Sequence, residues 1–324
     1  MAQSQLFGIG NVIGKKTTAN LEIGPIEAIA FSQQAAALAV ISGIEGPSYR
    51  PLGACMAVFE DGSTIGSLSS GCIEADIAHH AVKAIAQDQP LEIRYGKGSP
   101  FMDIKLPCGG GLDILIVPKP DRKALQDVMQ RHARRELCCV AIDMLTGKLS
   151  VRSDGKTERV GSVLSIRIEP ELRFLVFGAG PEAVTFASIV QSMGFENEVF
   201  SPDSKTLEAA GRAGCRTHHL SQKTMPQELD IDDRTAVVLF FHDHDWEPPI
   251  LVAALHSPAF FVGAQGSRRA AEARLLELEA LGVDTAGRSR LRGPMGLIPS
   301  TRNAQTLAVS VLAEILAEPG LASK

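Results

Sequence analysis

Two cysteines in the first half of the chain lie in stretches of small residues, where a thiol is open to a ligand. Cys72 follows Gly71 at the end of the run GSLSSGC, directly before a predicted helix, and Cys108 precedes Gly109 and Gly110. A helix N-terminus lowers the pKa of a nearby thiol, and glycine-rich backbone presents N–H groups to an anion. The two thiols could ligate a soft metal, react with one another or hold an activated sulfur ligand, whereas the alternative is an inert buried cysteine. Their spacing is not CxxC, which argues against a structural zinc site.

A cation occupies a stiffened loop nearby. The run GPSYRPLGA at 46–54 places Arg50 between two prolines. A guanidinium held in this way is suited to gripping a phosphate or a carboxylate. Turn residues around a solvated arginine explain the same composition, so both interpretations stay open.

A nucleotide-type turn stands in the second half of the chain. The run GAGPEA, with Gly178, Gly180 and Ala183 at the fingerprint positions, follows the strand pattern RFLVF and opens a helix. Such glycines allow a tight turn and close approach of a phosphate to the helix N-terminus. The acid that binds ribose should lie about 20 residues on; Ser201 stands there, and Asp203 is the nearest acid. The pattern predicts a Rossmann-type βαβ unit that either binds NAD(P) or another nucleotide, or uses the turn only structurally.

Two further runs follow predicted strands of this half. His242 and Asp243 begin HDHD after TAVVLFF, and Gly266, Ser267 and Arg268 lie in GAQGSRR at a helix start. The carboxyl ends of central strands form the crevice of doubly wound folds, and a capped helix N-terminus can hold an anion. The alternatives are a structural loop and solvated arginines. Adjacent loop residues rarely converge on one ion, so we assign no metal site here.

The elements that must position these residues differ between the two halves. Apolar periodicity and turn signals predict a mixed α+β first half, with helices at 25–31, 73–87 and 122–134 and strands at 37–44, 54–60, 64–67, 91–95, 112–117, 138–144 and 149–152. The second half alternates strands at 174–177, 198–200, 235–241 and 259–262 with helices at 182–193, 204–212, 249–255 and 268–281, and a last helix spans 304–316. Such alternation predicts a doubly wound parallel sheet.

The length of the chain and a polar, proline-containing segment near its middle suggest two domains. The chain has 324 residues, and the polar run SDGKTERV precedes Pro170 and a new strand pattern. At about 150 residues per domain, we expect a loose arm over 1–20, an α+β domain over 21–165 and a Rossmann-like domain over 166–324.

Composition excludes several classes. Lys and Arg number 32 against 37 Asp and Glu, a net charge of −5, which argues against nucleic acid or an anionic membrane as the main partner. No run reaches the roughly 18 apolar residues of a membrane span. The first basic pair follows the mildly apolar N-terminal segment, the reverse of a secretory signal, so we expect a cytoplasmic protein. Its six scattered cysteines are then free thiols.

Taken in order, these segments resemble the XdhC/CoxI family, the accessory factors that mature xanthine dehydrogenase and related molybdenum hydroxylases. The resemblance rests on GPSYRPLGACMAV, GSLSSGCIEADI and PCGGGLDI in the first half, then on FGAGPEA, LFFHDHD, FVGAQGSRR and RGPMGLIPSTRNAQTLAVSVLAEIL. The chain departs from the family at Ser70, which replaces the second glycine of an SGGC motif, and at Ser201, where an Asp is common.

The resemblance implies a chaperone that binds the molybdenum cofactor (molybdopterin with its metal), protects it, supports its sulfuration and inserts it into an apo-hydroxylase of the xanthine dehydrogenase type. By the family's motifs, the cofactor-binding residues are Cys72, Cys108, Arg50, Ser48, Gly71, Gly109 and Gly110. A cysteine desulfurase and a cofactor donor are further expected partners, and a homodimer is the expected assembly. No metal is expected to be bound directly, except molybdenum through the cofactor.

Two other functions stay open on the sequence. The Rossmann half alone suggests an NAD(P)-dependent oxidoreductase, although no Tyr-x-x-x-Lys is present and the only tyrosines, Tyr49 and Tyr95, fall in the first half. A nucleotide-sensing module would work without the cysteines. Either function should survive replacement of Cys72 and Cys108 by serine, whereas a cofactor carrier should not.

Overall fold

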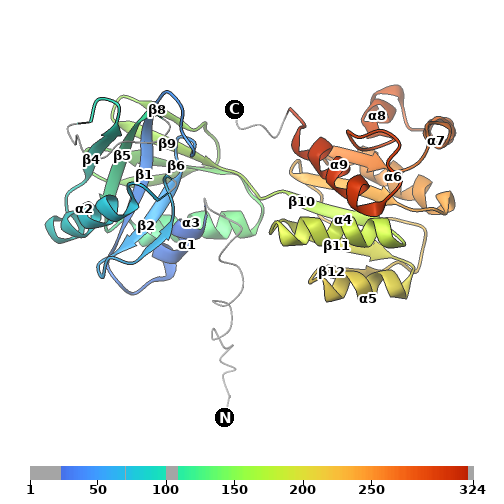
Figure 1. The fold of residues 1–324 in the computed structure, drawn as a ribbon, viewed down its shortest axis with the longest axis horizontal. Helices are drawn as coiled ribbons and strands as arrows, with labels where there is room; N and C mark the ends of the chain where they lie inside the picture. The colour runs from blue at the N-terminus through green and yellow to red at the C-terminus, as the bar shows by residue number, and fades with distance from the viewer. Residues whose placement is uncertain (1–22, 70, 100–108, 320–324) are drawn as a thin grey trace, which may run out of the picture. The chain divides into compact units, whose positions relative to one another are not determined.

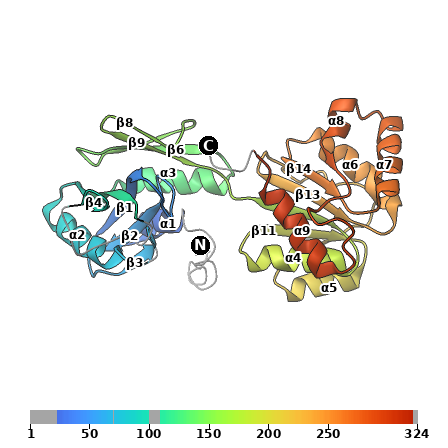
Figure 2. The same ribbon diagram turned by 45° about the horizontal axis from the view of Figure 1, so that its top comes forward.

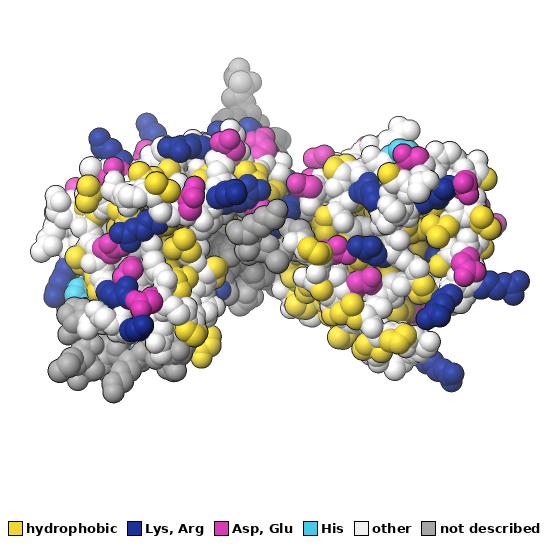
Figure 3. All heavy atoms as spheres, turned by 90° about the horizontal axis from the view of Figure 1, so that it is seen from above, with side chains coloured by type: hydrophobic (Ala, Val, Ile, Leu, Met, Phe, Trp, Pro, Cys, Tyr) yellow, Lys and Arg dark blue, Asp and Glu magenta, His cyan; other side chains and the backbone are white. Residues whose placement is uncertain are grey.

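The computed structural model describes residues 23–69, 71–99 and 109–319, and the chain divides into two compact units between Pro170 and Glu171 (Figures 1 and 2). The first unit contains two sheets and the second contains one, and each unit has its own hydrophobic cores. Figure 3 shows Lys and Arg side chains interspersed with Asp and Glu on the visible face of each unit.

A five-stranded antiparallel sheet is the centre of the first unit. Its strands, in spatial order, are β3 (Thr64–Gly66), β2 (Cys55–Phe59), β1 (Ala36–Glu45), β5 (Gly111–Pro118) and β4 (Leu91–Gly96). β1 is apolar over most of its length because both of its faces are buried: Leu38 and Val40 enter one core, and Ala37, Ala39 and Ile41 enter the other. The period-2 alternation of a strand separates the two sets.

Different elements cover the two faces of this sheet. Helix α2 (Glu74–Gln87) packs on one face through Ile77, Ala81 and Ile85, which recur at helical spacing. The other face packs against helices α1 (Gly24–Phe31) and α3 (Arg122–Ala133) and a four-stranded sheet. That sheet has the order β7 (Leu149–Arg152), β6 (Cys138–Asp143), β9 (Val163–Ile168) and β8 (Glu158–Val160).

The second unit is a six-stranded parallel sheet with helices on both faces. Its strand order is β12 (Arg216–His219), β11 (Glu196–Ser201), β10 (Arg173–Gly178), β13 (Thr235–Phe240), β14 (Phe261–Ala264) and β15 (Leu291–Arg292). One core includes residues of α4 (Pro181–Ser192) and α9 (Ala304–Leu316), and the opposite core includes residues of α6 (Glu247–His256) and α7 (Arg268–Ala280). Shorter elements are α5 (Ser204–Arg212), α8 (Thr285–Ser289) and the 3-10 turn η1 (His244–Trp246).

The predicted fold class is confirmed: an α+β first unit precedes a doubly wound parallel sheet. Some elements were not predicted. The last three residues of the polar run SDGKTERV form β8, and β9 follows it. Residue 165 lies within β9, which pairs with β6. β12 is exposed along its whole length, so no apolar pattern marks it. In the described part of the chain, none of the helices has the length and apolar character needed to cross a bilayer.

Candidate functional site

Three connections that carry the predicted cofactor-binding residues leave the same edge of the five-stranded sheet. Glu45 at the end of β1 pairs with Gly111 at the start of β5, and Gly111 pairs with Gly96 at the end of β4. On the other side of β1, antiparallel pairing brings the start of β2 and the end of β3 to this edge. The connections 46–54, 67–73 and 97–110 therefore depart from one edge, which we call the loop edge.

The first and third connections touch through their backbones. A Cβ on Gly110 would overlap the carbonyl oxygen of Pro47, and a Cβ on Gly46 would lie 3.7 Å from the Gly110 Cα. Only glycine fits at position 110, so the middle glycine of the GGG run is required for this contact. Gly109 is exposed beside it with a φ of +71°. Cys108 lies outside the described residues, and its neighbour Gly109 marks where the chain reaches the loop edge.

Ser48 and Arg50 form a local turn on the first connection. The Ser48 hydroxyl donates to the Arg50 carbonyl oxygen at 2.7 Å and accepts from the Arg50 backbone N–H at 3.3 Å. Both residues are partly buried, whereas Tyr49 between them is 64% exposed. The Ser48 hydroxyl thus shapes the loop that carries the Arg50 guanidinium.

The loop before Cys72 folds around a carboxylate of the chain itself. Glu74 accepts hydrogen bonds from the Ser67 and Ser69 hydroxyls, at 2.7 and 2.8 Å, and from three backbone N–H groups at Leu68, Ser69 and Ile73. Burial opposes ionisation, but these hydrogen bonds outweigh it and lower the pKa of Glu74 to about 2. Three of the amides predicted to face an external anion are therefore bonded to a carboxylate of the chain itself. Cys72 follows with an exposed side chain, and its N–H donates to the Ser69 hydroxyl at 3.2 Å.

A buried hydrogen bond attaches the start of α2 to the sheet. The fully buried Tyr95 of β4 donates its hydroxyl to Asp76 of α2 at 2.6 Å. Burial and the Asp76 carboxylate both raise the pKa of Tyr95, so it remains a donor. The helix that follows Cys72 is thereby held against β4.

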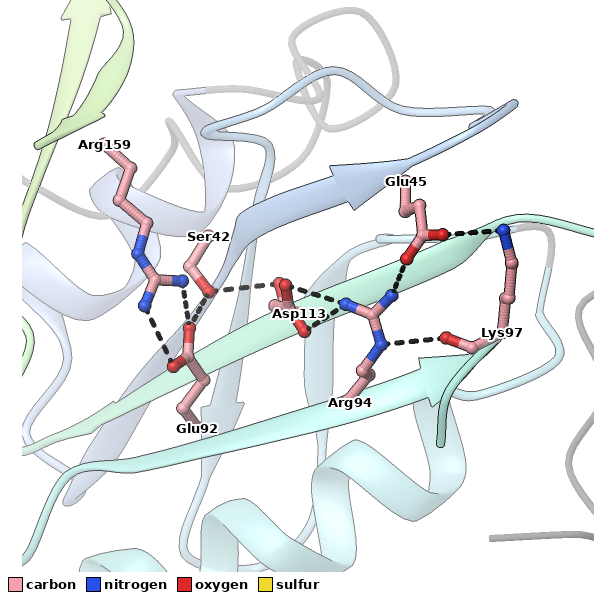
Figure 4. Close-up of polar contacts among 7 residues, drawn as sticks. All are labelled: Ser42, Glu45, Glu92, Arg94, Lys97, Asp113 and Arg159. Carbon is pink, nitrogen blue, oxygen red and sulfur yellow. Dashed lines mark hydrogen bonds and ion pairs between the residues drawn. The ribbon is translucent and has the colours of Figure 1, made fainter. Parts of the chain in front are cut away.

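A charged network lies on the opposite face of the same strands (Figure 4). Arg94 donates to both carboxylate oxygens of Asp113, at 2.9 and 3.1 Å, to the Lys97 carbonyl oxygen at 2.8 Å, and to Glu45. The Lys97 ammonium also pairs with Glu45, and its hydrogen bond and charge, with those of Arg94, lower the pKa of Glu45. Glu92 accepts from Arg159 and from the buried Ser42 hydroxyl.

In the second unit, one backbone N–H of the glycine turn is already hydrogen-bonded within the protein. The Gly180 N–H donates to the Thr206 hydroxyl at 2.9 Å, and that hydroxyl donates to Asp203 at 2.6 Å. Asp203 also caps α5 by accepting from the Thr206 N–H, and these bonds lower its pKa. Proline at 181 supplies no N–H. Asp203, predicted as a ribose ligand, is in this structure a helix cap.

His242 lies across this turn from Glu182. Their side chains approach to 3.3 Å, and His242 is 67% exposed. The predicted residues Gly178 and Ala183 are buried, with Gly178 packed so closely on β13 that a Cβ would lie 2.7 Å from the Phe240 carbonyl oxygen. Asp243 caps the short η1 turn. The structure therefore brings His242 to the glycine turn but directs Asp243 to a local hydrogen bond.

The remaining predicted residues cap α7. The Ser267 hydroxyl accepts from the Ala270 N–H at 3.2 Å, and Gly266 and Arg268 are exposed. Beneath them is an ion pair that the sequence did not predict. Arg274 donates through Nε to the Glu247 carboxylate at 2.8 Å and through Nη2 to the Gln265 carbonyl at 2.9 Å, with both charged side chains at least 97% buried.

The overlooked residues share one property. Glu74, Arg94, Glu247 and Arg274 are ordinary charged residues whose partners lie on other loops or elements. Helical spacing that places Arg274 on the inward face of α7, with Ala271 and Leu278, was the only available signal. Within the ranges that the structure describes, no group of His, Cys, Asp or Glu side chains could hold a metal ion.

Known proteins resemble this chain over nearly its whole length. A model of the XdhC Rossmann domain matches residues 174–315, and a model of the XdhC and CoxI family matches residues 31–96. The molybdenum cofactor insertion chaperone PaoD of Escherichia coli (strain K12) is 33% identical over 291 residues, covering 90% of this chain and 85% of that protein. A protein of Bacillus subtilis (strain 168), described as a probable subunit of xanthine dehydrogenase, is 24% identical, covering 90% and 95%.

A solved structure shares the fold. The crystal structure of a xanthine dehydrogenase from Bacillus halodurans matches with a TM-score of 0.73 at 20% identity, covering 93% of this chain and 98% of that chain. At this identity the match shows the architecture alone. The two family models and the long match to the chaperone confirm the resemblance that the motifs indicated. The chain belongs to the XdhC and CoxI family.

Proposed function

We propose that this protein binds the molybdenum cofactor at the loop edge, protects it and inserts it into a molybdenum hydroxylase of the xanthine dehydrogenase type. The single observation that carries the proposal is the departure of the three motif-bearing connections from one edge of the sheet. The relative named as a cofactor insertion chaperone supports the cargo. From the resemblance to the family's motifs, we assign the same seven residues to this role: Cys72, Cys108, Arg50, Ser48, Gly71, Gly109 and Gly110.

The chemistry of the loop edge suits this cargo. Cys72 exposes a thiol, and thiolates are soft ligands that bind molybdenum or its terminal sulfur readily. Arg50 supplies a permanent cation for the pterin phosphate. Because Glu74 binds three amides of the 67–73 loop, we assign phosphate recognition mainly to Arg50. The cofactor itself supplies the metal and dithiolene chemistry, and the protein holds and shields it.

Sulfuration support, a homodimer, and docking of a cysteine desulfurase and a cofactor donor are finer parts of the proposal. An exposed thiol beside the bound cofactor could shield the terminal sulfur that sulfuration adds to molybdenum. The family's pattern motivates each of these parts. Each is tested after cofactor binding itself.

The first test is cofactor retention. Purified protein is incubated with molybdenum cofactor and passed through gel filtration, and pterin in the protein fraction is measured by fluorescence after oxidation. We expect roughly stoichiometric pterin in the wild type and a large loss in Cys72→Ser and Cys108→Ser. Cys215→Ala, which removes a buried thiol in the second unit, is the matched control and should retain the cofactor.

The rival proposal is an NAD(P)-dependent oxidoreductase that uses the turn at Gly178 and Gly180. It has less support from the geometry, because the Gly180 N–H is already bonded to Thr206 and Asp203 caps a helix. Absence of retained pterin together with saturable NAD(P) binding in the same preparation would replace the chaperone proposal with this one.

A further inference from the structure

We propose that Arg94 is a positioning residue that sets the Arg50 loop and the 97–110 connection against each other at the loop edge. This inference rests on the proposed function, because its benefit is a correctly arranged cofactor site. Among the described residues, Arg94 contacts Glu45, Lys97 and Asp113 and not Arg50 or Cys72. It acts on the strand ends from which their loops depart.

The contacts of Arg94 join three neighbouring strands at their ends on the loop edge. Its guanidinium, on β4, binds Asp113 of β5 and Glu45 at the end of β1, and its Nε binds the Lys97 carbonyl oxygen just beyond β4 (Figure 4). Glu45 is the last residue before the Arg50 loop. Lys97 is the first residue of the 97–110 connection, and its N–H donates to the Gly110 carbonyl oxygen at 3.0 Å. Arg94 therefore holds the first residue of this connection directly, and that residue is bonded to the last.

The backbone around Arg94 is shaped to admit it. A Cβ on Gly111 would lie 2.7 Å from the Arg94 Nη2, and a Cβ on Gly98 would lie 3.1 Å from its Nε. The absence of a side chain at Gly111 therefore leaves room for the guanidinium, and its absence at Gly110 allows the contact with Pro47. This division gives separate reasons for two glycines in the run that follows Cys108.

The network is electrically balanced, which points to positioning rather than ligand binding. Three cations, Arg94, Lys97 and Arg159, face three carboxylates, Glu45, Glu92 and Asp113. Such a network offers no net charge to a phosphate. The planar five-donor fork of arginine meets several acceptors at once, which a lysine ammonium on a flexible stem cannot reproduce in the same geometry.

The end of β4 also supports the 67–73 connection. Successive strand residues point to opposite faces, so Tyr95, next to Arg94, faces α2 and binds Asp76 in the first turn of that helix. Cys72 lies two residues before α2 begins. Arg94 and Tyr95 thus hold, from the two faces of one strand, the elements that carry the loops of the proposed site.

The test compares Arg94→Gln with Arg159→Gln in the full-length protein. Arg159 belongs to the same network, is similarly exposed and loses the same charge, but it binds Glu92 and not Glu45 or Lys97. The first measurement is amide hydrogen exchange of cofactor-free protein in peptides covering 43–48 and 95–99. We expect faster exchange there in Arg94→Gln and in Arg94→Lys, with no change in Arg159→Gln. Equal exchange in Arg94→Gln and wild type would overturn the inference, whether or not cofactor is retained.

The second measurement is the rate at which bound cofactor is lost. Supporting residues around ligands typically change affinity by about 10–100-fold, so we expect Arg94→Gln to lose pterin on the order of tenfold faster than wild type and Arg159→Gln to behave as wild type. An equal effect of Arg159→Gln would show that Arg94 contributes only general stability. A wild type that retains no pterin refutes the proposed function, while hydrogen exchange still decides the role of Arg94.

Discussion

The two small-residue turns of this protein, at 66–73 and at 178–183, have similar compositions but present different side chains. In both, a partner within the chain takes backbone N–H groups: Glu74 in the first turn and Thr206 in the second. The first turn then presents the exposed Cys72, whereas His242 lies against Glu182 over the second. A turn with glycines is therefore insufficient to identify an anion site. The side chain that the turn presents distinguishes the two regions.

The charged network around Arg94 in the first unit and the ion pair of Arg274 in the second unit differ in burial. Arg94 in the first unit is 28% exposed and contacts more than one carboxylate, whereas Arg274 in the second is 3% exposed and pairs with Glu247. Water screens the first network and not the second. A substitution in the Arg94 network should therefore shift the loops with little loss of stability. A substitution in the Arg274–Glu247 pair should destabilise the second unit strongly.

Breaking the buried pair should have the largest effect. Glu247→Ala leaves the Arg274 charge buried without its carboxylate, so we expect the second unit to lose about 3–5 kcal/mol of unfolding free energy. Trp246, the single tryptophan, lies beside Glu247 and packs on Phe241, so its fluorescence reports unfolding of this unit in urea.

The matched control for that experiment removes both charges. Glu247→Met with Arg274→Met leaves no uncompensated ion and should cost clearly less than the single change. If the double variant is as unstable as Glu247→Ala, the pair is not the reason for the loss.

Removing the Glu74 carboxylate should have an intermediate effect, and one that depends on pH. The pKa of Glu74 falls from 4.5 to about 2 in the folded protein, so its stabilisation is complete above about pH 4.5 and is lost as the pH falls towards 2. We expect Glu74→Gln to unfold more easily at pH 7, by about 2 kcal/mol for hydrogen bonds to a charged group, and to lose less stability than wild type between pH 5 and pH 2.

The readout is chemical denaturation of the first unit followed by circular dichroism across that range. Glu60→Gln, an exposed carboxylate in the same unit, is the control and should leave the pH profile unchanged. Parallel profiles for wild type and Glu74→Gln would contradict the assigned role of the carboxylate.

The smallest effect concerns the second turn. Glu182 places a carboxylate in the first turn of α4, near the helix end that would attract a phosphate. Glu182→Gln should therefore strengthen binding of an adenine dinucleotide only a few-fold, from a weak starting value, because such charge–dipole effects amount to about 0.3–1 kcal/mol. Calorimetric titration with NAD measures it. Tight binding by the wild type would remove the contrast between the two turns.

Much of this architecture was predictable from the chain alone. Apolar periodicity predicted β1, α2 and the strand–helix alternation of the second unit, because a buried face imposes its period on the sequence. β12 was not predicted because an exposed edge strand carries no such pattern. β9 was not predicted because a polar run precedes its alternating residues Leu164, Ile166 and Ile168. Of the predicted site residues, Cys72 and Arg50 stood out by type and by neighbours. Their shared edge did not, since register is set by pairing between distant strands.

The sequence by itself determined the two-unit α/β architecture, the family and the residue types that could meet a soft-metal cofactor, because these follow from local period and from motifs within a dozen residues. Only the tertiary structure decided that three connections depart from one edge, that Glu74 fills its own loop, and that Arg94 spans Glu45, Lys97 and Asp113. The physical reason is that hydrogen bonds and ion pairs depend on distances between residues far apart in the chain. Those distances exist only once the sheet has paired.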